Sequence, residues 1–111
     1  MVAILHDLTS RFFRVLQRDI KAETLPLKQG KDGAFILLIG DLGLSRQVPL
    51  SATMKSVVGT VRCMAPEICA GLPYTDFADM WSVGILLYFL VMGEYPFTTG
   101  APTDTLIESC F

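Results

Sequence analysis

Charged side chains are scarce in this sequence. Nine lysines and arginines and eleven aspartates and glutamates make up 18% of the 111 residues, and the net charge is −2. Ordinary soluble domains carry about 25% charged residues. Because there is no basic excess, the composition argues against a nucleic-acid partner and against binding to an anionic membrane.

Polar residues are few for a chain of this length. Hydrophobic residues make up 51% of the sequence, and the mean hydropathy is +0.48. A small domain has a high ratio of surface to volume and should be more polar than average. We therefore expect these residues to form the interior of a larger domain; the alternative is an ordinary small domain rich in apolar residues.

Cysteine is also sparse. Only Cys63, Cys69 and Cys110 occur, and no two of them form a C-x-x-C pair. Such a set argues against a disulfide framework and against a zinc site, and it fits a reducing compartment. The first seven residues lack the basic and apolar regions of a signal peptide. We expect an intracellular and cytoplasmic protein.

One long apolar run is present, from Met80 to Met92, with no charge over 13 residues. As a helix it would be about 20 Å long, whereas the hydrocarbon core of a bilayer is about 30 Å thick. Asp79 precedes the run, and Pro96 limits its extension. The run therefore predicts a buried core helix rather than a membrane span.

The first half of the chain predicts a helix, a loop and a strand. Apolar residues recur at spacings of three and four over residues 1–16, which indicates a helix. A polar loop over 17–24 follows, and a glycine-containing turn is expected at 28–33. The apolar run 34–39 predicts a short buried strand. Residues 41–56 have no clear period and are interpreted as a long irregular segment.

The second half predicts two helices. Ala65-Pro66-Glu67 is suited to open a short one, because proline fits the first turn and glutamate stabilises its positive end. Thr75 or Asp76 is a suitable N-cap for a helix over about 77–92. Gly93 follows as a stop signal.

Four segments, taken in order, resemble the signature motifs of eukaryotic protein kinases. They are LQRDIKAET at 16–24, which is similar to the catalytic loop; IGDLGLSR at 39–46, similar to the metal-binding D-F-G stretch; GTVRCMAPE at 59–67, similar to the end of the activation segment; and DMWSVG at 79–84, followed by EYPF at 94–97. Short motifs are weak alone, but four in the right order are specific. The sequence of residues 40–46 and 56–60 most resembles that of the NIMA-related serine/threonine kinases.

The resemblance implies a mainly α (α+β) fold. We expect a fragment of the kinase C-terminal lobe, with helices around a buried central helix and a short β-hairpin by the catalytic loop. Residues 1–111 would be a partial kinase domain. Its parts would be a first helix at 1–16, a catalytic loop at 17–24, a metal-binding and activation segment at 41–67, and a central helix at 77–92.

The resemblance also implies the site residues, the cofactors ATP and Mg²⁺, and a protein as substrate or partner. Asp19 would orient the substrate hydroxyl as a catalytic residue, and Lys21 would place a cation by the transferred phosphate. Asp41 would bind Mg²⁺ and the nucleotide, with Thr24 as the second metal and cofactor ligand. The alternative for each carboxylate is a solvated loop charge.

Regulatory residues are implied in the same way. Ser56 occupies the position of an activation-loop phosphosite, and Arg18 could pair with a phosphate there; an unmodified loop serine is the alternative. Thr60 would help to hold Asp19. Asp79 would tether the backbone of the catalytic loop from below.

The sequence departs from the family pattern in several places. Thr24 replaces the metal-binding asparagine, Gln17 replaces a histidine that packs under the D-F-G segment, and Leu42 replaces phenylalanine. The 111 residues also contain no glycine-rich phosphate loop and no V-A-I-K lysine.

Three hypotheses follow from these departures. The first is a serine/threonine kinase, of which this chain would be a truncated piece with negligible activity of its own. The second is a degenerate kinase-like scaffold or interaction module without catalysis. The third is a remnant that does not fold alone.

Overall fold

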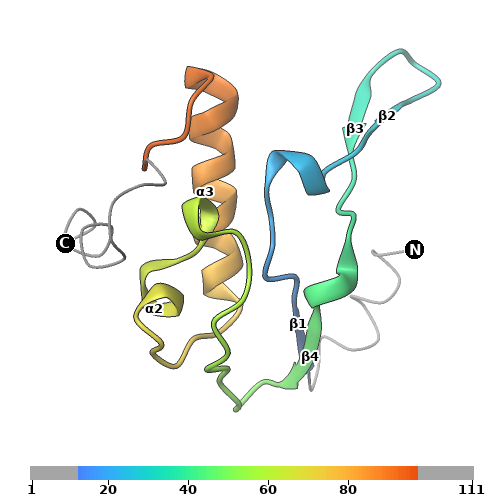
Figure 1. The fold of residues 1–111 in the computed structure, drawn as a ribbon. Coiled ribbons are helices and arrows are strands. Elements are labelled where there is room, and N and C mark those ends of the chain that lie inside the picture. The colour runs from blue at the N-terminus through green and yellow to red at the C-terminus, as the bar shows by residue number, and fades with distance from the viewer. Residues whose placement is uncertain (1–12, 98–111) are drawn as a thin grey trace.

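The computed structural model describes residues 13–97, which form two small antiparallel sheets, three 3₁₀ turns and two helices (Figure 1). In chain order the elements are β1 (Phe13–Leu16), η1 (Ala22–Thr24), β2 (Leu27–Gln29), β3 (Phe35–Leu37), η2 (Leu42–Leu44), β4 (Arg46–Pro49), η3 (Val61–Cys63), α2 (Pro66–Cys69) and α3 (Phe77–Met92).

The predicted helix over 1–16 is wrong where the structure can test it. Residues 1–12 lie outside the described part, and residues 13–16 are strand β1, which pairs with β4 in the register Phe13↔Pro49 to Leu16↔Arg46. The segment 41–56 is therefore not wholly irregular either. Four residues fit a helical and an extended pattern equally well, and the partner strand, whose paired residues lie 30 to 36 positions further on, decides between them.

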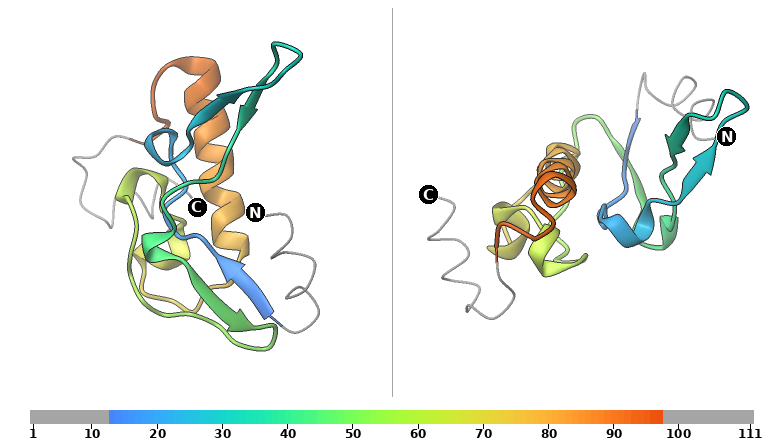
Figure 2. Two further views of the ribbon diagram at one scale, coloured as in Figure 1. Left: turned by 90° about the vertical axis from the view of Figure 1, so that its right-hand side faces the viewer. Right: turned by 90° about the horizontal axis from the view of Figure 1, so that it is seen from above.

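The predicted turn at 28–33 and the strand after it are present as the hairpin β2–β3. The Gly30 amide donates to the Ala34 carbonyl at 2.7 Å, and Gly33 has a φ of +82°. The prediction that this strand is buried is wrong, since Phe35 is 69% exposed. The hairpin extends away from the helices (Figure 2), so few described residues can cover it.

Helix α3 has the predicted bounds. Asp76 is its N-cap residue, and Gly93 ends it in the left-handed conformation with a φ of +76°. Only one face is buried, at the i, i+4, i+7 and i+8 positions Ala78, Ser82, Ile85 and Leu86. The opposite face is exposed, and Val91 reaches 81%. The central helix, which was expected to be buried, is thus covered by residues 13–97 on one face only.

The short helix α2 also begins where the sequence predicted, with Pro66 in its first turn. None of the helices in the described part is long and apolar enough to cross a membrane.

Two apolar clusters hold the site between them. The larger joins β1, β4, α2 and the start of α3, through Leu16, Val48, Ala65, Ile68, Tyr74 and Ala78. The smaller consists of Ile20, Leu25 and Leu86. Residues 17–24 run between the two clusters, so the packing on either side fixes both ends of this loop.

Candidate active site

The backbone of the loop 17–24 is anchored on α3. Asp79 accepts a hydrogen bond from the Gln17 amide at 2.7 Å and one from the Arg18 amide at 2.9 Å. Arg18 has a φ of 69°, and the two bonds hold this uncommon backbone conformation. Burial raises the pKa of Asp79, while the two backbone donors act in the opposite direction. The expected tether is therefore present.

Asp19, Lys21 and Thr60 form a closed triangle of polar contacts. The Thr60 hydroxyl donates to Asp19 Oδ1 at 2.6 Å, Lys21 Nζ lies 2.8 Å from Asp19 Oδ2, and Lys21 Nζ donates to Thr60 Oγ1 at 2.8 Å. The predicted catalytic loop and the predicted activation segment meet here. The Asp19 side chain is only 12% exposed, so the triangle is largely shielded from water.

The triangle sets the charge of its members. Burial alone would raise the pKa of Asp19, but the hydrogen bonds from Lys21 and Thr60 outweigh it and leave the pKa below its usual value. The bond to Asp19 raises the pKa of Lys21. Asp19 is therefore a carboxylate at neutral pH and can accept a hydrogen bond from a substrate hydroxyl.

Thr24 lies inside the catalytic loop. Its buried hydroxyl is 2.9 Å from the Asp19 carbonyl and 3.0 Å from the Lys21 carbonyl, and it accepts the Lys21 amide at 3.1 Å. Within residues 13–97 no hydrogen bond joins this side chain to Asp41. The geometry assigns the hydroxyl to loop closure, and its role as a metal and cofactor ligand stays a prediction.

Asp41 stands at the start of η2 in the left-handed conformation, with a φ of 49°. Its side chain is exposed and accepts the Gly43 amide at 3.3 Å. The preceding Gly40 donates its amide to the Thr24 carbonyl at 2.9 Å. A Cβ on Gly40 would lie 3.0 Å from that carbonyl, so the two loops approach closely because this residue is glycine.

The donor set at Asp41 fits magnesium bound to a nucleotide. In the part of the chain that the structure describes, no three His, Cys, Asp or Glu side chains gather into a metal cage. Mg²⁺ commonly binds through one or two carboxylates, with water and substrate phosphates completing its shell. A single exposed carboxylate suits that arrangement better than a bare-ion site.

Gln17 is a site residue that the sequence analysis underrated. Its side chain is buried and accepts the Asp19 amide at 2.7 Å. Its Nε2 atom donates to the carbonyls of Gly40 at 3.2 Å and Asp41 at 3.0 Å. The resemblance placed the residue at this position under the D-F-G stretch, but the individual partners, 23 and 24 residues away, cannot be read from the sequence.

The predicted regulatory residues also meet. Arg18 is 8% exposed and donates from Nε to the Leu44 carbonyl at 2.6 Å and from a terminal nitrogen to Ser56 Oγ at 2.7 Å. The Tyr74 hydroxyl donates to the Ser56 carbonyl at 2.8 Å. The exposed Ser56 is thus held at the guanidinium without any modification.

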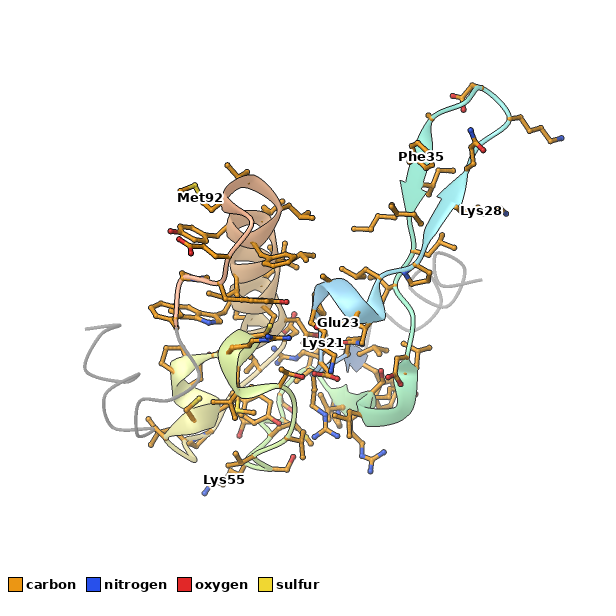
Figure 3. All side chains as sticks on the ribbon, turned by 45° about the horizontal axis from the view of Figure 1, so that its top comes forward. Lys21, Glu23, Lys28, Phe35, Lys55 and Met92 are labelled. Carbon is orange, nitrogen blue, oxygen red and sulfur yellow. The ribbon has the colours of Figure 1, made fainter. Side chains whose placement is uncertain are left out.

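A second bridge between the same loops was not predicted. Arg62 pairs with Glu23 at 2.8 Å and lies over the Tyr95 ring, 4.2 Å from its centroid. Figure 3 shows Glu23 beside Lys21 at the centre of the molecule, far from Phe35 at the hairpin. Together with the contact between Lys21 and Thr60, this bridge joins the end of the activation segment to the catalytic loop.

Several protein kinases are similar to this chain in sequence. Human ribosomal protein S6 kinase-related protein is 40% identical over 96 residues, which are 86% of this chain and 21% of that protein. Mouse Aurora kinase C is 37% identical over 92 residues, 83% of this chain and 32% of the relative. The Caenorhabditis elegans serine/threonine-protein kinase nekl-2 is 32% identical over 83 residues, 75% of this chain and 22% of the relative.

The chain therefore spans between about a fifth and a third of the length of these relatives. Residues 2–110 match the protein kinase domain family over nearly the whole sequence. This chain belongs to the protein kinase domain family.

Proposed function

We propose that the protein containing this chain is a serine/threonine kinase that transfers a phosphoryl group from ATP to protein hydroxyls. The observation that carries the proposal is the triangle of Asp19, Lys21 and Thr60 next to the Asp41 loop. Phosphoryl transfer depends on positioning and on charge stabilisation, and the triangle supplies a carboxylate and a cation in fixed positions. The lysine two residues after the aspartate resembles serine/threonine kinases.

Each side chain has a distinct task in this proposal. The Asp19 carboxylate accepts the hydrogen bond of the substrate hydroxyl and orients it toward the phosphate. Lys21 balances the charge that develops on the transferred group. Asp41 holds Mg²⁺, the ion that neutralises the nucleotide phosphates when it is bound.

The 111 residues alone should transfer phosphate only negligibly. They contain no glycine-rich loop and no V-A-I-K lysine, so the nucleotide would lack most of its burial and positioning. Asp19-dependent turnover by the purified 111-residue polypeptide would contradict this expectation. The expectation concerns this polypeptide only, and a longer product must be tested separately.

Ser56 is proposed as the phosphorylated switch of the site. A phosphate adds about −1.5 to −2 charges at pH 7. Arg18 already donates to the Ser56 hydroxyl, so a phosphate would gain a charge-assisted bond without a large movement of the arginine. Equal activity of a Ser56→Ala variant and of the phosphorylated wild-type protein would rule out the switch.

A relationship to the NIMA-related kinases is a further proposal, supported by the sequence of residues 40–46 and 56–60. Relatives named for other kinase groups have identities in the same range, so the proposal depends on these short stretches. Flanking sequence of the native product that matches another kinase group better would contradict it.

A scaffold without catalysis is the second candidate, and Thr24 favours it. Its hydroxyl bonds to the backbone of its own loop. Of the two expected metal ligands, Asp41 then remains to hold Mg²⁺. The exposed apolar surface of α3 is also compatible with a binding role.

Phosphotransfer by the native product separates the two candidates. The product would be isolated with an antibody to residues 28–56, its mass measured, and its transfer of labelled phosphate from ATP to a serine/threonine peptide library compared with that of Asp19→Asn. We expect the variant to lose at least about 100-fold in rate. Asp32→Asn is the matched control, because Asp32 lies in the hairpin turn and bonds only locally to the Ala34 amide. Equal rates for wild type and Asp19→Asn would favour the scaffold.

A further inference from the structure

Tyr74 connects the segment before α3 to the irregular stretch between β4 and η3. Its side chain is 3% exposed in the larger apolar cluster, and Met54 packs against the same cluster. The Met54 amide donates to the Tyr74 carbonyl, and the Tyr74 amide donates to the Met54 carbonyl, each at 2.9 Å. No helix or strand of the described part lies between Pro49 and Val61, so this backbone pair holds a stretch without regular structure of its own.

The phenol of Tyr74 adds a contact to the backbone of Ser56. Its hydroxyl donates to the Ser56 carbonyl at 2.8 Å and lies 3.3 Å from Ser56 Oγ. A tyrosine hydroxyl has one proton, and the carbonyl takes it, so the Ser56 hydroxyl is the donor in the second contact. Ser56 Oγ in turn accepts a hydrogen bond from Arg18 at 2.7 Å. Ser56 is thus held between a guanidinium and a phenol, although the residue is exposed.

A phosphate on Ser56 would leave the main contact of the phenol intact. The ester replaces the hydroxyl proton of Ser56, so its oxygen could no longer donate to Tyr74. The bond from Tyr74 to the Ser56 carbonyl involves the backbone and does not depend on the side chain. The pair of bonds between Met54 and Tyr74 is formed by backbone groups alone. The contacts that hold residues 54–56 are therefore the same with and without the modification.

We propose that Tyr74 is a positioning residue that orders residues 54–56 beside Arg18 in the unmodified protein. A phosphate on Ser56 would then add charge to a segment already in place, instead of ordering it. Without the phenol, the segment would depend on the phosphate, because among the described side chains Arg18 would be left to hold Ser56. The inference rests on the proposed function only in that Ser56 is taken as its switch.

Tyr74→Phe is the informative substitution, because it removes the hydroxyl and keeps the ring that fills the apolar cluster. It also keeps the backbone groups that pair with Met54, so any loosening comes from the lost bond to Ser56. Tyr88→Phe is the matched control. Tyr88 lies on α3, is 41% exposed and forms no hydrogen bond with another residue of the range 13–97. Both variants would be made in the full-length native product.

The experiment is hydrogen exchange of the unphosphorylated product, measured by mass spectrometry at single-residue resolution. The amides of Met54 and Tyr74 report on the backbone pair. In Tyr74→Phe we expect both amides to exchange about five- to tenfold faster than in wild type, as for one lost hydrogen bond. In Tyr88→Phe they should change less than about twofold. The Gly93 amide, which bonds to Phe89 at the end of α3, should keep its rate throughout. Equal rates in the two variants would overturn the proposal.

Phosphoserine at position 56 tests for an effect that simple filling of space would not produce. In Tyr74→Phe the phosphate should bring the Met54 amide back to within about twofold of wild type, because Arg18 then forms a charge-assisted bond. In wild type it should change the rate by less than about twofold. A wild-type rate that falls at least about fivefold with the phosphate would overturn the proposal. A variant that stays fast with the phosphate would support Tyr74 and contradict the switch at Ser56.

The wild-type comparison also decides the case in which Tyr74→Phe does not fold. Met54 and Tyr74 amides that are protected before phosphorylation support the proposal, and amides that become protected only after it contradict the proposal. None of these rates depends on turnover. If the amides behave as expected but the native product shows no phosphotransfer, the kinase proposal fails while the role of Tyr74 stands.

Discussion

The polar loop around Asp19 is buried, whereas the apolar strand β3 of the hairpin β2–β3 is exposed, which is the opposite of what their compositions suggest. Gln17, Arg18 and Thr24 are 5–8% exposed, whereas Phe35 in the hairpin is 69% exposed. The polar loops are buried because their groups find hydrogen-bond partners on several segments. Among the described residues, the hairpin forms backbone hydrogen bonds only within itself and with the ends of the adjoining loops. Hydrophobicity in a sequence thus indicates a tendency to be buried, while burial itself requires a neighbouring surface.

Gly59→Ala tests how closely the activation segment packs against the catalytic loop, and it should have the largest effect on stability. Gly59 has a φ of +117°, and a methyl group there would overlap the Arg18 carbonyl oxygen. We expect a loss of about 4 kcal/mol in the free energy of unfolding, from backbone strain together with overpacking. Chemical denaturation measures it. Gly71→Ala is the control, because its φ is also positive but no atom lies within 4 Å, and it should lose only about 1 kcal/mol.

Leu16→Ala and Phe35→Ala compare the two regions directly. Leu16 is fully buried in the larger cluster, so its truncation should remove about 3 kcal/mol. Phe35 is mostly exposed, and its truncation should change the stability by less than about 0.5 kcal/mol. Equal losses in the same denaturation assay would show that the hairpin is covered in solution, and the contrast between the regions would fail.

The two anchored carboxylates should respond to pH with opposite signs. Asp19 has a pKa below its unfolded value, so its contribution to stability is present above that unfolded value and is lost as the pH falls through the folded pKa. Asp79 has a raised pKa, so its contribution favours the folded state at low pH and declines as the pH rises through that raised value.

Denaturation between pH 2.5 and pH 7 measures these contributions. Relative to wild type, Asp19→Asn should lose less stability on acidification, and Asp79→Asn should lose more. Parallel curves of stability against pH for the two variants would contradict the opposite signs assigned to Asp19 and Asp79.

The bridge between Arg62 and Glu23 should be the weakest contact tested. The Glu23 side chain is 54% exposed, so solvent screens the pair. Arg62→Ala should cost about 1 kcal/mol or less, including the loss of the stacking on Tyr95. Glu23→Gln should cost less than Arg62→Ala and lose its effect in 1 M salt. A loss above about 2 kcal/mol in the free energy of unfolding would contradict the expectation that this exposed ion pair is weak.

Local chemistry explains which elements the sequence could predict. Helix α3 has an N-cap residue, an apolar run without charge and Gly93, all within 18 residues, and its bounds were predicted correctly. The hairpin turn was equally visible in its two glycines. Strand β1 was missed because four residues carry too little periodicity to separate strand from helix, and its partner β4 lies beyond the range of any local pattern.

The candidate site also has features that the sequence predicted and features that it left open. The order and the sequences of four motifs indicated the family, which the family match confirms. The structure brings Asp19, Lys21 and Thr60 together, as the resemblance implied. The assignment of Thr24 shows the limit of such reasoning. A hydroxyl can bind a metal or close a loop, and only the neighbouring carbonyls at 2.9 and 3.0 Å show which contacts it makes here.

The sequence by itself determined the family, the bounds of α3 and the residue types at the site, because each depends on neighbours within a few positions. Tertiary structure alone decided that Gln17 joins two loops, that Arg62 pairs with Glu23, and that the apolar strand β3 lies exposed. These features depend on contacts between residues 23 to 39 positions apart and on how much surface is near enough to cover the strand. Distances of that kind arise only when the chain has folded.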